Sequence, residues 1–299
     1  MDKQGKPGLP PAKIVVGLGE ILWDVLPDGR AVGGAPANFV FHTAALGAEA
    51  ILVNSVGEDA NGTELIRRME EEALSTEYIY RDAQHPTGTV TVRLDESGVP
   101  DYTIHEGAAW DFIPWTDSCG ELAKRAGAIC CGTLAHRSPV SRRTLRRFLE
   151  SVGKNTVKVV DVNLRQHYYS KELLEQLLSD ADIVKLNEVE FCRISSLFFL
   201  AGTETERLER LLERFSLQLI ALTKGGRGSR LKTPEKDSTL AGEEITAVDT
   251  VGAGDAFAAS LVLDWIQGLD LDLIHKRADA IAATVCLNKG AWVRSKAPA

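Results

Sequence analysis

Short apolar runs alternate with longer segments of helical periodicity along most of this chain. The runs are nearly continuous in apolar residues, which is typical of strands buried on both faces. One longer segment carries Leu208, Leu211, Leu212 and Phe215 at offsets of three, four and seven, which marks a single helix face. The expected strands are 13–19, 50–56, 128–131, 157–160, 182–185 and 217–223, and the expected helices are 36–46, 61–73, 141–151, 171–178, 204–215 and 256–267. This order predicts an α/β fold with a central, mostly parallel sheet and helices on both faces.

Two segments interrupt this alternation. Residues 21–32 and 89–104 carry short patterns of period two with Gly and Pro turns, which predict half-buried strands. We expect antiparallel strands that leave the main sheet at about 20–34 and 88–110 and form a small lid over a site. The sequence contains no internal repeat and no low-complexity linker, so residues 1–299 are expected to form one α/β domain with these insertions.

Composition and charge narrow the class of protein. The 299 residues are 44% hydrophobic and 25% charged, which is the mixture of an ordinary globular protein. With 34 basic and 42 acidic side chains the net charge is −8, which argues against nucleic acid as a partner because duplex binding needs clustered positive charge. The longest apolar segment, 256–263, is far shorter than a membrane span, so no membrane partner is expected.

The cysteines and the N-terminus indicate a compartment. Five cysteines form an odd set with no CxxC pair, so neither a disulfide framework nor a zinc site is indicated. Cys130 and Cys131 lie in an apolar run and are expected to be buried thiols. Residues 1–14 lack the apolar stretch of a signal peptide, and we therefore expect a cytoplasmic protein.

The most specific chemical signal lies at 249–257. Gly252, Ala253 and Gly254 precede a predicted helix, where backbone N–H groups and the helix dipole favour an anion. Asp255 falls in the first helical turn beside them. A carboxylate there can orient an attacking hydroxyl and accept its proton during phosphoryl transfer. The alternative is a glycine-rich turn in which Asp255 is only a capping residue.

A second glycine-rich turn, Gly33 and Gly34, leads into the helix that contains Asn38. The glycines permit close approach of a polar ligand to the backbone, and the Asn38 amide can both donate and accept a hydrogen bond. Asp24, in an apolar stretch just upstream, is either a ligand for substrate hydroxyls or a turn residue. Taken alone this turn is a weak signal, because many such turns merely connect elements.

Polar residues also follow three predicted strands, where open α/β sheets bind ligands. They lie in the segments 161–165, 185–190 and 223–228. The last segment, which includes Lys224, suits the phosphates of a nucleotide. Each segment could be an ordinary strand-to-helix loop, but three at one sheet edge make a shared site the better interpretation.

Together these motifs resemble the ribokinase-like (PfkB) carbohydrate kinase family. Residues 249–257 (DTVGAGDAF) match the C-terminal signature of that family, 33–39 (GGAPANF) its N-terminal one, and 187–190 (NEVE) its N-x-x-E motif. Residues 223–229 and 288–291 also fit, so the resemblance spans essentially the whole chain. It implies a central sheet with helices on both faces, a small β lid, ATP as donor, Mg²⁺ and often a monovalent cation such as K⁺.

The resemblance also implies roles for individual residues. Asp255 is the catalytic base, and the anion hole consists of Gly252, Ala253 and Gly254. The sugar is contacted by Asp24, Gly33, Gly34, Asn38 and Arg165. The nucleotide is bound by Asn187, Thr223, Lys224, Gly226, Gly228 and Asn288. Glu190 organises Mg²⁺ through water, and Asp249 with the backbone of Val251 belongs to a monovalent-cation loop.

Departures from the family pattern indicate the substrate. Ala35-Pro36 and the element Asp161-x-Asn163-x-Arg165 resemble fructokinases, although 2-keto-3-deoxygluconate kinases share the second element. Those kinases tend to carry a Tyr-Tyr-Arg lid element for the substrate carboxylate, and the corresponding residues 102–107 contain no arginine. The chain is therefore similar to a fructokinase, which converts ATP and D-fructose to a phosphofructose and ADP.

Other interpretations stay open. The substrate could be 2-keto-3-deoxygluconate, ribose or a nucleoside, and a non-catalytic sugar-binding homologue is a further alternative. Exposed lid edges would favour a homodimer. Because the chain is acidic overall, ATP must be attracted by helix N-termini, Lys224 and Mg²⁺, and we expect the acidic residues to lie away from the strand ends.

Overall fold

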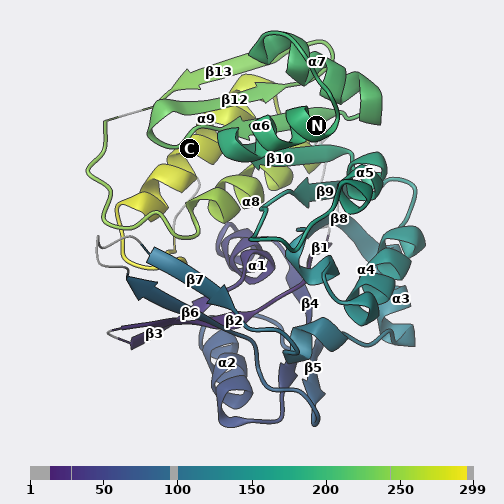
Figure 1. Cartoon of the computed structure of the whole chain (residues 1–299), viewed down its shortest axis with the longest axis vertical. Coiled ribbons are helices and arrows are strands. Elements are labelled where there is room, and N and C mark those ends of the chain that lie inside the picture. Colours follow the sequence, from purple (N-terminus) through teal and green to yellow (C-terminus); the bar gives the residue numbers. More distant parts are fainter. Residues whose placement is uncertain (1–13, 28, 95–99, 243, 295–299) are drawn as a thin grey trace, which may run out of the picture.

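The structure is a computed structural model that describes residues 14–27, 29–94, 100–242 and 244–294. Its main sheet has nine strands in the order β13-β12-β11-β10-β9-β8-β1-β4-β5 (Figure 1). These strands are β1 (Ile14–Leu18), β4 (Ala50–Gly57), β5 (Ile79–Asp82), β8 (Ala126–Cys131), β9 (Val157–Asp161), β10 (Ile183–Asn187), β11 (Leu219–Thr223), β12 (Gly228–Lys232) and β13 (Asp237–Ala241). All neighbours from β5 to β11 are parallel, while β12 and β13 are antiparallel additions at one edge. The predicted mostly parallel sheet is confirmed, and Lys13, expected to begin its first strand, lies outside the described residues.

Helices cover both faces of this sheet, as predicted. They are α1 (Ala35–Ala45), α2 (Ala60–Glu71), α3 (Asp117–Arg125), α4 (Pro139–Ser151), α5 (Lys171–Asp180), α6 (Glu188–Leu197), α7 (Glu204–Phe215), α8 (Ala253–Ile266) and α9 (Leu271–Cys286), with short 3-10 turns at Ala109–Phe112, Leu134–His136 and Gly225–Arg227. Buried residues form two large clusters, because alternate strand residues point to opposite faces. Val16 packs with the α3–α7 side and Val15 with the side of α1, α2, α8 and α9.

A separate four-stranded sheet, which we call the lid, lies beside α1 and α2 (Figure 1). Its strands, in the order β3-β2-β6-β7, are β2 (Leu22–Leu26), β3 (Gly29–Gly33), β6 (Thr89–Leu94) and β7 (Pro100–Ile104). The two hairpins are antiparallel, but β2 and β6 pair in parallel, so the expectation of purely antiparallel strands was wrong. The reason is that β2 follows β1 and β6 follows β5, so both leave the carboxyl edge of the parallel sheet in the same direction.

Cys130 and Cys131 are buried, as the sequence predicted. Cys119, Cys130 and Cys131 are buried free thiols, Cys286 is half-buried and Cys192 is exposed. Burial raises the pKa of the Cys131 thiol to about 12, so it stays protonated at neutral pH. None of the helices in the described ranges is both long and apolar enough to cross a lipid bilayer.

Candidate active site

The start of α8 forms the turn that the sequence predicted as an anion site. Gly252 is the residue before the helix and has φ of 82°, a left-handed conformation that favours glycine. A Cβ at this position would lie 2.7 Å from the Cβ of Ala291, so space as well as conformation requires glycine. The first N–H groups of a helix have no intrahelical acceptor. That of Ala253 donates to the carbonyl of Thr250 at 3.3 Å, so the N–H groups of Gly254 and Asp255 are the ones that face a ligand.

Asp255 lies in the first turn of α8 and faces α1 from across the site. Its Oδ2 accepts a hydrogen bond of 2.8 Å from Nδ2 of Asn38, 217 residues away in the chain. Burial and the nearby Asp161 raise the pKa of Asp255 to about 6, against the opposing effects of Lys185, Asn38 and Arg165. The carboxyl is therefore mostly ionised at neutral pH but close enough to its pKa to accept and return a proton.

A buried ion pair lies directly beneath this turn. Nζ of Lys185, the middle residue of β10, donates to both carboxylate oxygens of Asp161 at 3.0 and 2.8 Å. A Cβ added to Gly254 would lie only 2.9 Å from Nζ of Lys185, so the ammonium group sits immediately behind the anion-binding turn. Local sequence patterns did not predict this pair, although a lysine within an apolar strand is a detectable signal.

The residues predicted to contact the sugar lie between the lid and the main sheet. Asp24 is on β2 and Gly33 on β3, where a Cβ on Gly33 would lie 2.1 Å from Asp24 Oδ2. Gly34 has φ of 106° and approaches the carbonyl of Glu20 so closely that a Cβ would lie 2.4 Å from that oxygen. The two glycines are therefore required by close packing around two acidic residues.

Three acidic groups and one cation meet on this side. Burial raises the pKa of Asp24 to about 6, and Arg165 opposes the shift. Burial likewise raises the pKa of Glu20 to about 7, and its Oε2 has no hydrogen-bond partner among the described residues. Arg165 is exposed and acts electrostatically on Glu20, Asp24 and Asp255. Glu20 was missed in the sequence, where it stands at the end of the first apolar run.

The predicted nucleotide residues lie at adjacent strand ends. Asn187 ends β10 beside Thr223, which ends β11. A Cβ on Gly226 would meet no described heavy atom within 4 Å, so the turn after β11 leaves room for a ligand. Gly228, with φ of 94°, has the carbonyl of Leu240 where a Cβ would point, which is a packing requirement of the β12–β13 edge. Asn288 follows α9 and donates 2.8 Å to the carbonyl of Thr284.

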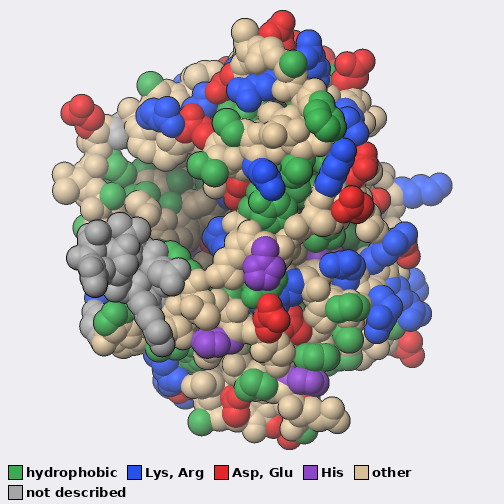
Figure 2. Space-filling model, viewed as in Figure 1, with side chains coloured by type: hydrophobic (Ala, Val, Ile, Leu, Met, Phe, Trp, Pro, Cys, Tyr) green, Lys and Arg blue, Asp and Glu red, His purple; other side chains and the backbone are tan. Residues whose placement is uncertain are grey.

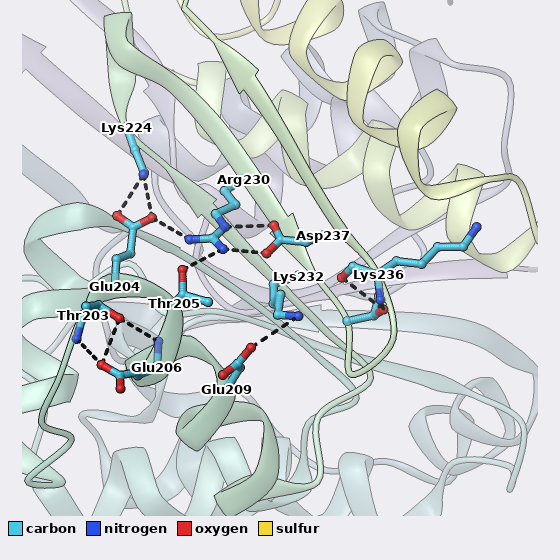
Figure 3. Close-up of polar contacts among 11 residues, drawn as sticks. Thr203, Glu204, Thr205, Glu206, Glu209, Lys224, Arg230, Lys232, Lys236 and Asp237 are labelled. Carbon is cyan, nitrogen blue, oxygen red and sulfur yellow. Dashed lines mark hydrogen bonds and ion pairs between the residues drawn. The ribbon is translucent and has the colours of Figure 1, made fainter.

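Lys224 is engaged by an acidic partner. Its Nζ lies 2.8 Å from the carboxylate of Glu204, which also accepts from Arg230, while Arg230 reaches Asp237 (Figure 3). Burial alone would raise the pKa of Glu204, but its bonds to these two cations lower it. The positive charge that we expected Lys224 to offer to ATP is thus partly compensated by α7.

Asn187 and Glu190 form a capping box at the start of α6. Asn187 Oδ1 accepts from the backbone of Glu190 at 3.0 Å, and Glu190 Oε2 accepts from the backbone of Asn187 at 2.8 Å. Glu190 Oε1 accepts from the backbone of Leu164 at 3.0 Å. Burial and Asp161 raise the pKa of this carboxyl. Each oxygen retains a second lone pair, so the carboxylate fits a role in holding Mg²⁺ through water.

The predicted cation loop is held together by Asp249. One carboxylate oxygen accepts from the backbone of Val251 and the other from the backbone of Gly290, both at 3.0 Å. Val251 is exposed. Among the residues that the structure describes there is no cluster of three or more His, Cys, Asp or Glu side chains that could hold a metal ion alone.

The expectation that acidic residues lie away from the strand ends was wrong. Five carboxyl groups lie at or next to these strand ends: Glu20 and Asp161 at strand ends, Glu190 and Asp255 in the first turns of helices, and Asp24 on the facing lid strand. Burial raises the pKa of four of them, and that of Glu20, about 7, leaves this carboxyl partly protonated at neutral pH. Lys185 and Arg165 supply positive charge beside them. Figure 2 shows a hollow between the body and the lid on this side of the molecule.

Comparisons with known proteins identify the family and the fold. Residues 28–297 match the model of the pfkB family of carbohydrate kinases. The fructokinase of Salmonella typhimurium is 30% identical over 287 residues, which cover 92% of this chain and 92% of that protein. The structure of an uncharacterized sugar kinase from Pyrococcus horikoshii has a TM-score of 0.83 and 26% identity over 95% of both chains. A fructokinase of Vibrio cholerae with bound fructose, ADP and calcium has a TM-score of 0.80 at 23% identity, covering 95% of this chain and 96% of its own.

Proposed function

Because the chain belongs to the pfkB family of carbohydrate kinases, and is thus an ATP-dependent kinase, we propose that it phosphorylates a hydroxymethyl group of free D-fructose. The observation that carries this proposal is Asp255, a carboxylate with a pKa of about 6 in the first turn of α8. It lies next to a turn suited to phosphate and is bonded to Asn38 from the predicted sugar side. A proton acceptor and an anion site side by side are what phosphoryl transfer to an alcohol requires.

In the proposed reaction, the sugar hydroxyl gives its proton to Asp255 while its oxygen attacks the γ-phosphorus. The new O–P bond forms as the bond to the bridging oxygen breaks, and ADP leaves. Backbone N–H groups of the 252–254 turn stabilise the charge on the transferring group, which is the larger contribution to rate. Glu190 would hold Mg²⁺ through water, and the bound ion would neutralise part of the phosphate charge. Lys185 adds a fixed positive charge behind the turn.

The region around the lid favours a neutral sugar as substrate, because the buried arginine near its base, Arg137, is already paired. Gln166 donates to the carbonyl of Tyr102 at 2.5 Å, and Tyr168 to that of Ile104 at 3.3 Å, which tie β7 to the loop after β9. Arg137, near the base of the lid, is paired with Asp111 at 2.8 Å and is buried, so its charge is already compensated. Several relatives of this chain are named fructokinases.

One observation favours a sugar acid as the second candidate. Arg165 is exposed at the predicted sugar site, and a guanidinium can bind a carboxylate through two hydrogen bonds. A 2-keto-3-deoxygluconate kinase would use it in this way. Ribose and nucleosides stay further alternatives without a specific observation in their favour.

The proposal also includes a homodimer that pairs through the lid edges and a K⁺ ion in the loop around Asp249. The strand order leaves β3 and β7 with unpaired edges, and pairing of lids in a homodimer would cover them. The loop around Asp249 would bind K⁺ next to the 252–254 turn and order its amides.

A coupled ADP assay over a panel of substrates tests the proposal. D-fructose, 2-keto-3-deoxygluconate, ribose and adenosine would be compared with and without K⁺. We expect kcat/KM for fructose to exceed the others by about tenfold or more, which corresponds to ~1.4 kcal/mol of transition-state discrimination. Preference for the sugar acid, lost in Arg165→Gln, would support the second candidate instead. No turnover with any substrate, despite fructose binding by calorimetry, would support the non-catalytic alternative.

A further inference from the structure

The segment after α9 packs against both α1 and the 252–254 turn. Ala291 is buried, and its Cβ occupies the space that a side chain on Gly252 would need. Nε2 of His42 on α1 donates to the carbonyl of Ala291 at 2.8 Å. Burial lowers the pKa of His42 to about 4, so the ring is neutral at pH 7 and the donor is its single N–H. This segment therefore touches the two elements that carry Asn38 and Asp255.

Trp292 extends that contact to the reacting carboxylate. Its indole Nε1–H donates to Oδ1 of Asn38 at 3.0 Å, and Nδ2 of Asn38 donates to Oδ2 of Asp255 at 2.8 Å. The indole ring is stacked on Phe41, with centroids 5.0 Å apart and an interplanar angle of 8°. Stacking fixes the plane of the ring, and hence the direction of its N–H.

The orientation of the Asn38 amide matters because its two ends have opposite hydrogen-bonding roles. Nδ2 can only donate, and it stabilises a carboxylate that is ionised. Oδ1 can only accept, so it could face Asp255 favourably only if that carboxyl were protonated. The indole N–H is also a pure donor, and it therefore selects the orientation in which Oδ1 points away from Asp255.

We propose that Trp292 is a positioning residue for phosphoryl transfer, whose indole N–H locks the Asn38 amide in the orientation that keeps Asp255 in its proton-accepting form. This inference rests on the proposed role of Asp255 as the base. Without the indole donor, both amide orientations are populated, and the flipped one holds the proton on Asp255.

Other groups also set the charge around Asp255, and a change at Trp292 leaves them in place. They come from five different parts of the chain: Glu20 after β1, Cys130 on β8, Asp161 on β9, Arg165 in the following loop and Lys185 on β10. Because they stay constant, a shift in the titration of Asp255 in a Trp292 variant reports on the amide.

The variant Trp292→Phe tests the proposal, since it keeps an aromatic ring over Phe41 and removes only the N–H. The measurement is kcat/KM for fructose from pH 5 to 9, whose acid limb reports the base of the free enzyme. We expect the limb to move to higher pH by about one unit, so that kcat/KM falls about fivefold at pH 6 and stays nearly unchanged at pH 8.5. Trp265→Phe is the matched control and should not move the limb.

Two results would overturn the proposal: an unmoved limb, or a loss of kcat/KM by the same factor at every pH, which is what a purely structural role produces. If Asp255→Asn kept the wild-type rate, the assignment of the base would fail instead, and the two failures are thereby distinguished.

A second measurement needs no activity and no folded variant of Trp292. In ¹⁵N-labelled wild-type protein, five indole N–H signals are expected from the five tryptophans. One of them should titrate with a midpoint near pH 6, the pKa of Asp255, and that titration should vanish in Asp255→Asn. Indole signals that are all flat between pH 5 and 8 would contradict the link from Trp292 to Asp255.

Discussion

Breaking the ion pair of Lys185 and Asp161 beneath the anion-binding turn should lower the stability of the protein and shift the pH dependence of the reaction. Lys185 Nζ contacts both carboxylate oxygens of Asp161, and the two side chains are only 11% and 8% exposed. Removing one partner leaves the other as a buried, uncompensated charge. We predict that Lys185→Met and Asp161→Asn each lose about 3–5 kcal/mol of stability.

That loss converts to a measurable change in Tm. With an unfolding entropy of about 2.1 cal/mol/K per residue, a chain of 299 residues has ~0.6 kcal/mol/K, so each single variant should melt about 5–8 °C below wild type. The double variant removes both charges and should recover most of this difference. Lys236→Met, which breaks the exposed pair with Asp270, is the control and should leave Tm unchanged.

The effects on catalysis should have opposite signs. Asp161 raises the pKa of Asp255 and Lys185 lowers it. The acid limb of kcat/KM should therefore move to higher pH in Lys185→Met and to lower pH in Asp161→Asn. Both variants lose stability, so a general loosening of the site cannot produce shifts in opposite directions. Shifts of the same sign, or single variants as stable as wild type, would refute this reasoning.

Two further predictions concern the turn and the buried Glu20. Gly252→Ala places a Cβ 2.7 Å from Ala291 at a left-handed φ, which should displace the amides of the turn. We expect kcat to fall by about 10²-fold or more while the circular dichroism spectrum stays unchanged. A near-normal kcat would contradict the role of the turn. The pKa of Glu20 is raised from 4.5 to about 7 in the folded state, so its contribution to stability is present below pH 4.5 and lost as pH rises through 7. The stability of Glu20→Gln relative to wild type should therefore increase as the pH rises from 5 to 8, by up to about 3 kcal/mol, in thermal unfolding. A stability difference between the two proteins that does not change with pH would contradict this.

The sequence pattern predicted the main sheet because its buried strands are continuous apolar runs. The hairpin of β12 and β13 was not predicted, because its strands are not continuous apolar runs. They carry charged residues that pair with one another, as Arg230 does with Asp237. Helix α9 was also missed, although Leu271, Ile274, Ala278 and Ile281 repeat at helical spacing and are buried. The parallel pairing of β2 with β6 could not be predicted locally, because it depends on the direction in which both strands leave the sheet.

The part of the site that consists of consecutive residues was predictable, as in the turn that ends at Asp255, because the local sequence determines the conformation of such a turn. Contacts across the fold were not: the bond from Asn38 to Asp255 joins residues 217 apart, and the bond from Trp292 to Asn38 joins residues 254 apart. The engagement of Lys224 by Glu204 depends on how α7 packs beside β11 and β12. Such pairings follow from tertiary packing, on which local periodicity carries no information.

The most direct test of the central claim is kcat of Asp255→Asn with D-fructose and MgATP, measured together with ADP affinity by calorimetry. If Asp255 accepts the proton of the sugar hydroxyl, kcat should fall by about 10²–10⁴-fold while the Kd for ADP changes by less than about threefold. A kcat within about threefold of wild type would contradict the assignment of Asp255 as the catalytic base.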